Sequence, residues 1–148
     1  MHKTVVDYGP ASGLSGDHGV TASLYPFEET ISRLKRAITD ADLWLIHEID
    51  PQMLLRRGGY EIRATRQLLF FHPRFMLRLL HGDPSALIEA PLKLVVMEMP
   101  TGAVIVRSSD PTDAFARYVG LGELGRELSE LCDTLTAAVT QTGPGKEN

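Results

Sequence analysis

The chain has 148 residues, a length typical of one domain, so two independent hydrophobic cores are not expected. Hydrophobic residues make up 43% and charged residues 23% of the sequence, which excludes disordered, collagen-like and coiled-coil chains. Because the formal net charge is -4, the sequence does not suit a protein that binds phosphate backbones, and we expect no nucleic-acid partner.

The sequence predicts a cytoplasmic protein. Its one cysteine, Cys132, cannot form an internal disulfide bond, which favours a reducing compartment. The first sixteen residues lack the apolar stretch of a signal peptide, and the longest apolar runs have four residues, whereas about 20 span a bilayer. We therefore expect neither export nor a membrane partner. Since Cys132 lies in a leucine-spaced segment, we interpret it as a packed side chain and not as a reactive nucleophile.

Composition divides the chain into three regions. Residues 1–19 are rich in glycine, serine and aspartate without an apolar period, and predict a flexible leader. Residues 20–140 carry the patterns of one ordered domain. Residues 141–148 are polar and contain Gly-Pro-Gly, so we expect a flexible tail.

Strands and helices alternate in the first half of the predicted domain. A strand over 20–25 precedes a helix that begins at Pro26, because apolar residues then recur at three- and four-residue steps. A second strand, 43–49, ends at Asp50-Pro51, since proline cannot continue a central strand. A short helical turn over 52–60 leads into a third strand.

The second half continues the alternation. The third strand, 61–71, is followed by a helix from Pro73, a residue favoured at the first helical position. Strands over 92–99 and 103–108 flank Pro100-Thr101-Gly102 and predict an antiparallel hairpin. A short helix over 114–119 and a long one over 123–139 complete the domain. The order β-α-β-β-α-β-β-α predicts a single-domain α+β fold with an antiparallel sheet packed on helices.

Several short segments of this domain, taken in their order and spacing, form a pattern that extends over most of its length. They are Pro26-Phe27-Glu28-Glu29-Thr30, Arg33-Leu34, Ala37-Ile38, His47-Glu48-Ile49-Asp50, Phe71-His72-Pro73, the run from Ala90 to Glu98, Val104-Ile105-Val106 and Asp110-Pro111. Together they resemble the family known as domain of unknown function 302. The resemblance implies a small domain with a curved antiparallel sheet packed on helices, often a homodimer, in a family without an established activity. Many relatives have glycine or cysteine, then asparagine, before the proline where this chain has Phe71 and His72, so ligand chemistry at that turn is not carried over.

Three carboxylates are candidates for a site. Alternation along the second strand places Glu48 and Asp50 on one face, and Glu98 lies in an otherwise apolar strand. Carboxylates that converge can perform acid-base work or hold a hard cation. The alternative is that Glu48 and Glu98 lie at a solvent-exposed sheet edge or in a dimer contact with an arginine.

A basic segment is the other candidate. Residues 56–78 contain six arginines and one acid, a local charge of +5 in a chain of net charge -4, and guanidinium groups recognise carboxylate and phosphate. His72 and Arg74, at the start of a helix, extend such a site. The alternative is that the arginines lie on different faces and pair with Glu28, Glu29 or a partner subunit. The predicted ligand-binding residues are Glu48, Asp50, Arg66, His72, Arg74 and Glu98.

No metal site or cofactor is predicted, because His47, His72 and His81 show no helix-spaced ligand pair and no cysteine joins them. Three functions remain open. The favoured one is a non-catalytic homodimeric module that binds a small anionic ligand. The second is an acid-base enzyme that uses Glu48 or Glu98 with His72, and the third is a structural protein-protein interaction domain.

Overall fold

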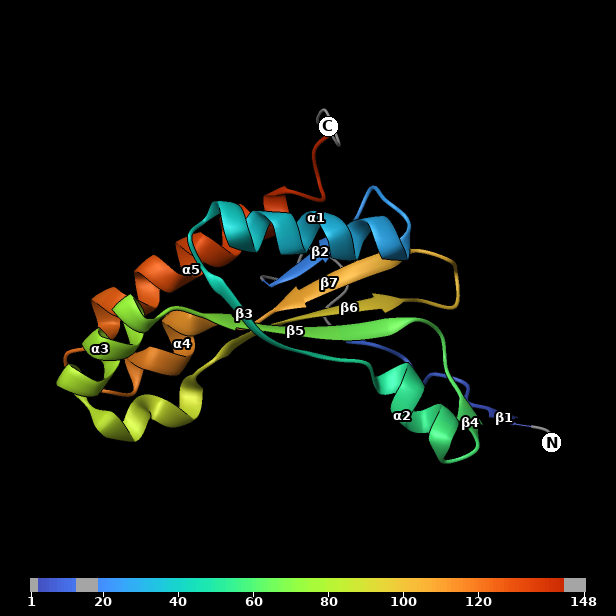
Figure 1. Ribbon diagram of the computed structural model, residues 1–148, viewed down its shortest axis with the longest axis horizontal. Helices are drawn as coiled ribbons and strands as arrows, with labels where there is room; N and C mark the ends of the chain where they lie inside the picture. Colours follow the sequence, from blue (N-terminus) through green and yellow to red (C-terminus); the bar gives the residue numbers. More distant parts are fainter. Residues whose placement is uncertain (1–2, 13–18, 143–148) are drawn as a thin grey trace.

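An antiparallel sheet with helices on one face forms the centre of the protein. The computed structural model describes residues 3–12 and 19–142, and within them five strands form one sheet in the order β2-β7-β6-β5-β3 (Figure 1). All neighbouring strands in this sheet are antiparallel. They are β2 (Val20–Ala22), β3 (Trp44–Ile49), β5 (Thr65–Phe71), β6 (Leu92–Glu98) and β7 (Val104–Ser108). The predicted single-domain α+β fold is confirmed.

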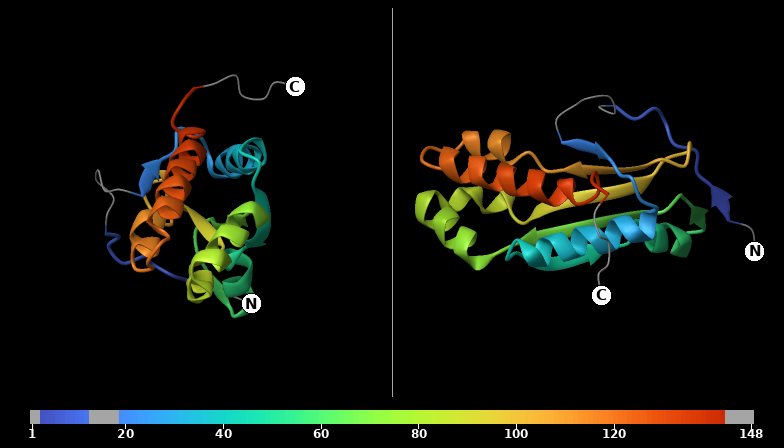
Figure 2. Two further views of the ribbon diagram at one scale, coloured as in Figure 1. Left: turned by 90° about the vertical axis from the view of Figure 1, so that its left-hand side faces the viewer. Right: turned by 90° about the horizontal axis from the view of Figure 1, so that it is seen from above.

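Two long helices, α1 (Phe27–Asp40) and α5 (Gly122–Ala137), cover one face of the sheet and lie side by side (Figures 1 and 2). Shorter helices connect the strands and extend the two ends of the molecule. They are α2 (Pro51–Arg57), α3 (Pro73–Gly82), the 3₁₀ helix η1 (Pro84–Glu89) and α4 (Pro111–Ala116).

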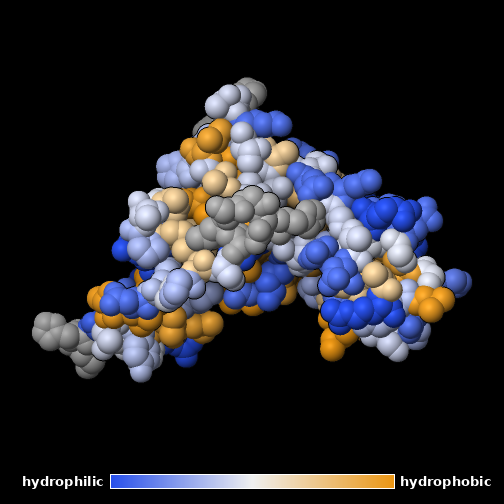
Figure 3. All heavy atoms as spheres, turned by 180° about the vertical axis from the view of Figure 1, so that it is seen from behind, coloured by the Kyte–Doolittle hydropathy of each residue, from blue (hydrophilic) through white to orange (hydrophobic). Residues whose placement is uncertain are grey.

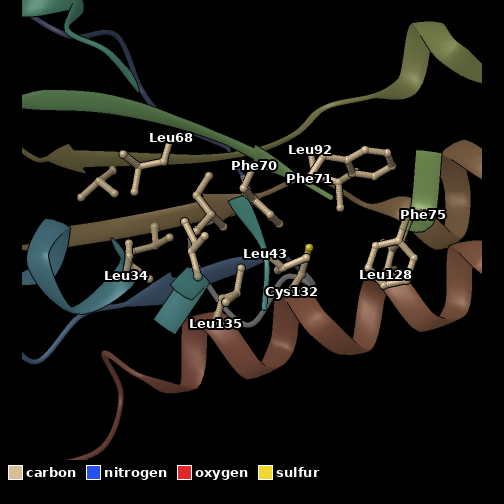
Figure 4. Close-up of a cluster of buried hydrophobic side chains, with 14 of the residues drawn as sticks. Leu34, Leu43, Leu68, Phe70, Phe71, Phe75, Leu92, Leu128, Cys132 and Leu135 are labelled. Carbon is tan, nitrogen blue, oxygen red and sulfur yellow. The ribbon is translucent and has the colours of Figure 1, made fainter. Parts of the chain in front are cut away.

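The core fills the space between the sheet and the two long helices. Alternate residues of β5 and β6, such as Leu68 and Leu94, face the helices and are fully buried. On α1, Leu34 and Ile38 repeat at helical spacing and meet them, so one apolar stripe of each element is covered (Figure 4). Leu135 of α5 belongs to the same buried cluster, so both long helices pack against this face of the sheet.

Local sequence signals place two junctions correctly. His72 caps α3 by accepting a hydrogen bond through Nδ1 from the Arg74 backbone N–H (3.0 Å), and Pro73 follows at the first position. The predicted hairpin joins β6 and β7, and Gly102 takes the positive φ of 90° that its turn requires.

Other segments differ from the sequence-based expectation. The predicted third strand, 61–71, is interrupted, because Tyr60–Glu61 forms a separate strand, β4, that pairs in parallel with β1 (Thr4–Val5). Strand β1 lies within the predicted flexible leader, so this part of the leader is a paired element. Residues 1–2 and 13–18 of that leader, and 143–148 of the predicted tail, lie outside the described residues. Within the described residues, no helix has the length and apolar character needed to cross a membrane.

Candidate functional site

Glu48 lies on the helix-covered face of the sheet. Its Oε1 lies 2.6 Å from Nζ of Lys35 on α1, and its Oε2 accepts a hydrogen bond from Nη1 of Arg66 on β5 (2.8 Å). A register shift between Leu45 and His47 puts Glu48 opposite the buried Leu68. Because the bulge breaks the alternation, Glu48 shares its face with Leu45, three residues earlier.

The ionised form of Glu48 is the stable one. Burial opposes ionisation, but the hydrogen bonds and charges of Lys35 and Arg66 outweigh it, so the pKa of Glu48 lies below its usual value of 4.5. A carboxylate that is held ionised by two cations is a poor proton donor and has few free lone pairs. The two ion pairs of Glu48 connect Lys35 on α1 with strands β3 and β5 of the sheet.

Arg66 is the centre of this charge cluster. Its side chain is 18% exposed, its guanidinium lies 5.5 Å from the ring centre of Phe27, and Nη2 is 3.9 Å from Glu28. Nε is buried without a hydrogen-bond partner in the described part of the chain. Glu28, one of the partners named by the alternative interpretation, is thus one of two carboxylates beside Arg66.

The structure does not bring Glu98 and Asp50 to Glu48. Glu98 lies on the same face of β6 as Val96, which is opposite Arg66. From the strand register and spacing, the Cα atoms of Glu48 and Glu98 are about 16 Å apart. Asp50 is the N-cap of α2, and its Oδ1 accepts the Met53 backbone N–H (3.0 Å).

His72 and Arg74 lie at the far end of β5, about 20 Å from Arg66 along the strand. His72 uses Nδ1 for the helix cap and packs edge-on against Trp44, with ring centres 5.2 Å apart. Arg74 donates from Nη1 to the backbone carbonyl and Oδ2 of Asp42. The six predicted ligand-binding residues therefore lie in four places: Glu48 and Arg66 in the charge cluster, Asp50 at the start of α2, His72 and Arg74 at the start of α3, and Glu98 at the end of β6.

Four of the six arginines in 56–78 have carboxylate partners, as their ion pairs show: Arg56 with Glu61, Arg66 with Glu48, Arg74 with Asp42 and Arg78 with Glu127. Glu48, Asp42 and Glu127 come from outside this segment and offset three of its five excess positive charges. Local sequence could not reveal this, because the partners of the last two are more than 30 residues away.

A cleft of about 580 Å³ lies between α3 and α5. Its lining residues are Arg74, Phe75, Arg78, Glu127, Glu130, Leu131 and Thr134. Arg78 and Glu127 form a bidentate pair across it, with N–O distances of 2.9 and 2.8 Å, which lowers the pKa of Glu127. Of these lining residues, only Arg74 and Arg78 belong to the basic segment that the sequence marked as a candidate. The three- and four-residue spacing of Glu127, Leu131 and Thr134 is the signal that marks the α5 side.

A second hollow, of about 300 Å³, is lined by apolar and aromatic side chains at the start of β3 and α3. The residues around it are Trp44, Ile46, Phe71, His72, Pro73, Met76 and Leu77. Trp44 is 55% and Ile46 50% exposed, although both lie in a strand. The sequence signal for this surface is the four-residue apolar run Leu43-Trp44-Leu45-Ile46.

Metal-ligating side chains and the thiol of Cys132 are the remaining candidate groups. Within residues 3–12 and 19–142, no group of three or more His, Cys, Asp or Glu side chains is arranged to hold a metal ion. Cys132 is buried in the core, and burial raises the pKa of its thiol to about 12. The thiol is therefore protonated near neutral pH.

Comparison with known proteins gives the family. The family model for "Domain of unknown function DUF302" matches residues 19–142. The chain belongs to the DUF302 family. A crystal structure of an uncharacterized conserved DUF302 protein from Bacillus stearothermophilus has the same fold, with a TM-score of 0.72 and 18% identity over 82% of this chain and 94% of that chain. No protein with a curated description matches. The resemblance to DUF302 seen in the sequence is confirmed.

Proposed function

We propose that this DUF302 domain is a non-catalytic module that works as a homodimer. The observation that carries the proposal is the exposed apolar surface of β3, formed by Trp44 and Ile46. Strand β3 is at the edge of the sheet, paired with β5 on one side. An exposed apolar edge strand promotes aggregation unless another surface covers it. A second copy of the chain has the same apolar surface and can cover it in a two-fold interface.

The geometry favours a non-catalytic role over the acid-base enzyme. Proton transfer needs the acid and the base within hydrogen-bond reach of one substrate. Glu48 is held ionised by Lys35 and Arg66, Glu98 is about 16 Å away, and His72 uses Nδ1 in a helix cap. These groups serve different elements and do not converge on one cleft.

Size-exclusion chromatography with light scattering tests the homodimer. We expect twice the chain mass for the wild type and the single chain mass for Ile46→Lys, which places a charge in the exposed apolar surface of β3. Val119→Lys is the matched control, since Val119 is 94% exposed in the turn between α4 and α5. A wild-type chain that stays monomeric at high concentration contradicts the proposal and favours the third function, a surface for a different protein.

A small anionic ligand is the second part of the proposal, and the cleft between α3 and α5 supports it. Arg74 and Arg78 are four residues apart on one face of α3, and both line the cleft. Glu127 already occupies one N–H of each Nη of Arg78, so an anion must share that guanidinium or displace Glu127.

Thermal unfolding with millimolar phosphate or succinate tests ligand binding, because a ligand that binds only the folded state raises the unfolding temperature. We expect stabilisation of the wild type, a loss of it in Arg78→Ala and a larger effect in Glu127→Gln, which removes the competing charge. Arg57→Ala is the control, since Arg57 is exposed and outside the cleft. Equal behaviour of Arg78→Ala and Arg57→Ala contradicts this site.

A further inference from the structure

Helix α2 presents its apolar side chains to solvent. Every residue of this helix is at least partly exposed, and Leu54 is 51% exposed between Met53 and Leu55. A surface helix normally buries its apolar side against the body of its own domain. Here Met53, Leu54 and Leu55 are each at least 36% exposed, and α2 lies at one end of the molecule on the same lobe as β1 and β4 (Figure 1).

The hollow beside Trp44 is apolar, as the exposed side chains of α2 are, and its shape is complementary to that of a helix. It is concave, and Trp44, Met76 and Leu77 line it together with other apolar surfaces. An apolar cavity of about 150 Å³ accommodates benzene, so the roughly 300 Å³ here have room for two aliphatic side chains. Figure 3, seen from behind, shows apolar atoms gathered on the lobe that carries β1, α2 and β4.

Strand β3 connects these two features. Trp44, its first residue, borders the hollow, and α2 begins two residues after Ile49, its last. A two-fold axis at the middle of β3 reverses the strand, so the end of one β3 lies beside the start of the other. The same operation brings α2 of each copy to the hollow of the other copy.

The β-bulge in this strand decides what kind of contact the two copies make. The register shift between Leu45 and His47 interrupts regular strand geometry at the centre of β3. Bulged edges pair poorly with further strands. Inserted side chains, and not a long backbone ladder, therefore supply most of the contact.

We propose that α2 of each subunit docks in the apolar hollow of the other, with Leu54 of the partner subunit between Trp44 and Leu77. This rests on the homodimer proposed above and names the surfaces through which it forms. The contact occurs twice per dimer, because a two-fold interface is self-complementary. Each copy thus covers the exposed apolar helix of the other.

Two charge substitutions test the docking. Leu54→Arg changes the inserted helix and Leu77→Arg changes the hollow, and both positions are exposed in the single chain, so folding is retained. We expect each to weaken dimerisation by about 100-fold in sedimentation equilibrium, since the central contact is lost twice. Val119→Arg is the control, and circular dichroism checks the fold of every variant.

A covalent test complements this one. The double variant Leu54→Cys with Leu77→Cys is expected to give a disulfide-linked dimer under mild oxidation, whereas Leu54→Cys alone does not. The buried Cys132 does not compete. A dimer that Ile46→Lys dissociates but Leu54→Arg leaves intact overturns the docking and leaves the homodimer standing. A wild-type monomer overturns both, and binding of a fluorescent apolar dye that Leu77→Arg abolishes then assigns the hollow to a small apolar ligand.

Discussion

Glu48 is a partly buried carboxylate whose ionised form the fold stabilises. It is ionised between Lys35 and Arg66, and its pKa is lowered in spite of burial. A lowered pKa means that its contribution to stability is complete above the ordinary value of 4.5 and is lost as the pH falls through the folded-state value. Replacement by a neutral side chain leaves two cations without their shared partner.

We therefore expect Glu48→Gln to lower the free energy of unfolding by about 1 kcal/mol at neutral pH. The difference from the wild type should vanish well below pH 4.5, where both side chains are neutral. Urea denaturation at the two pH values measures both quantities. The control is Glu130→Gln, an exposed site on α5 where a change of less than about 0.5 kcal/mol is expected. A difference that persists unchanged at low pH contradicts the ionic role of Glu48.

Cys132 gives a second test at the scale of one residue. The residue is 3% exposed and burial raises the pKa of its thiol to about 12, so the reactive thiolate is scarce. We expect no reaction with Ellman's reagent in the native protein near neutral pH and one thiol per chain after denaturation. Rapid labelling of the folded chain would mean that α5 opens readily, and it would also revive a nucleophilic role.

Helices α4 and α5 approach each other closely at Gly125. A Cβ atom at this position would lie 2.8 Å from the Pro111 carbonyl oxygen and 3.0 Å from Cβ of Phe115. We expect Gly125→Ala to lower the free energy of unfolding by about 1–3 kcal/mol, because overpacking against backbone outweighs the better helix propensity of alanine. The matched control is Gly122→Ala on the same helix, where a Cβ meets open space. Urea denaturation should show that variant equal to the wild type or slightly more stable.

At the scale of elements, what could be predicted depends on how local the determinant is. The hairpin around Gly102 and the start of α3 at His72-Pro73 are determined by residues adjacent in the sequence, and both predictions were confirmed. The bulge between Leu45 and His47 arises from pairing with β5, more than 20 residues away. Likewise β4 exists because Thr4–Val5 supplies its partner, which alternation within 61–71 does not encode.

At the scale of the whole molecule, the same limit applies to the candidate site. The sequence singled out Glu48 and Arg66 as separate candidates but did not predict that they pair with each other, because the pairing depends on strand register. The local charge of +5 favoured an anion site, yet Asp42 and Glu127 from other elements balance Arg74 and Arg78. Electrostatics acts through space, so a charge count along the chain overstates the field that a ligand meets.

Stability itself should depend on concentration if the whole molecule is a dimer. When unfolding is coupled to dissociation, mass action raises the unfolding temperature as the protein concentration rises. For two chains of this length, we expect a shift of about 2 °C for each tenfold increase in concentration. Differential scanning calorimetry over a wide concentration range measures it, and Ile46→Lys, in which the exposed apolar surface of β3 carries a charge, should show no shift. A wild-type unfolding temperature that does not change with concentration would mean that folding is complete within one chain, and that the apolar surface of β3 is covered by something other than a second copy.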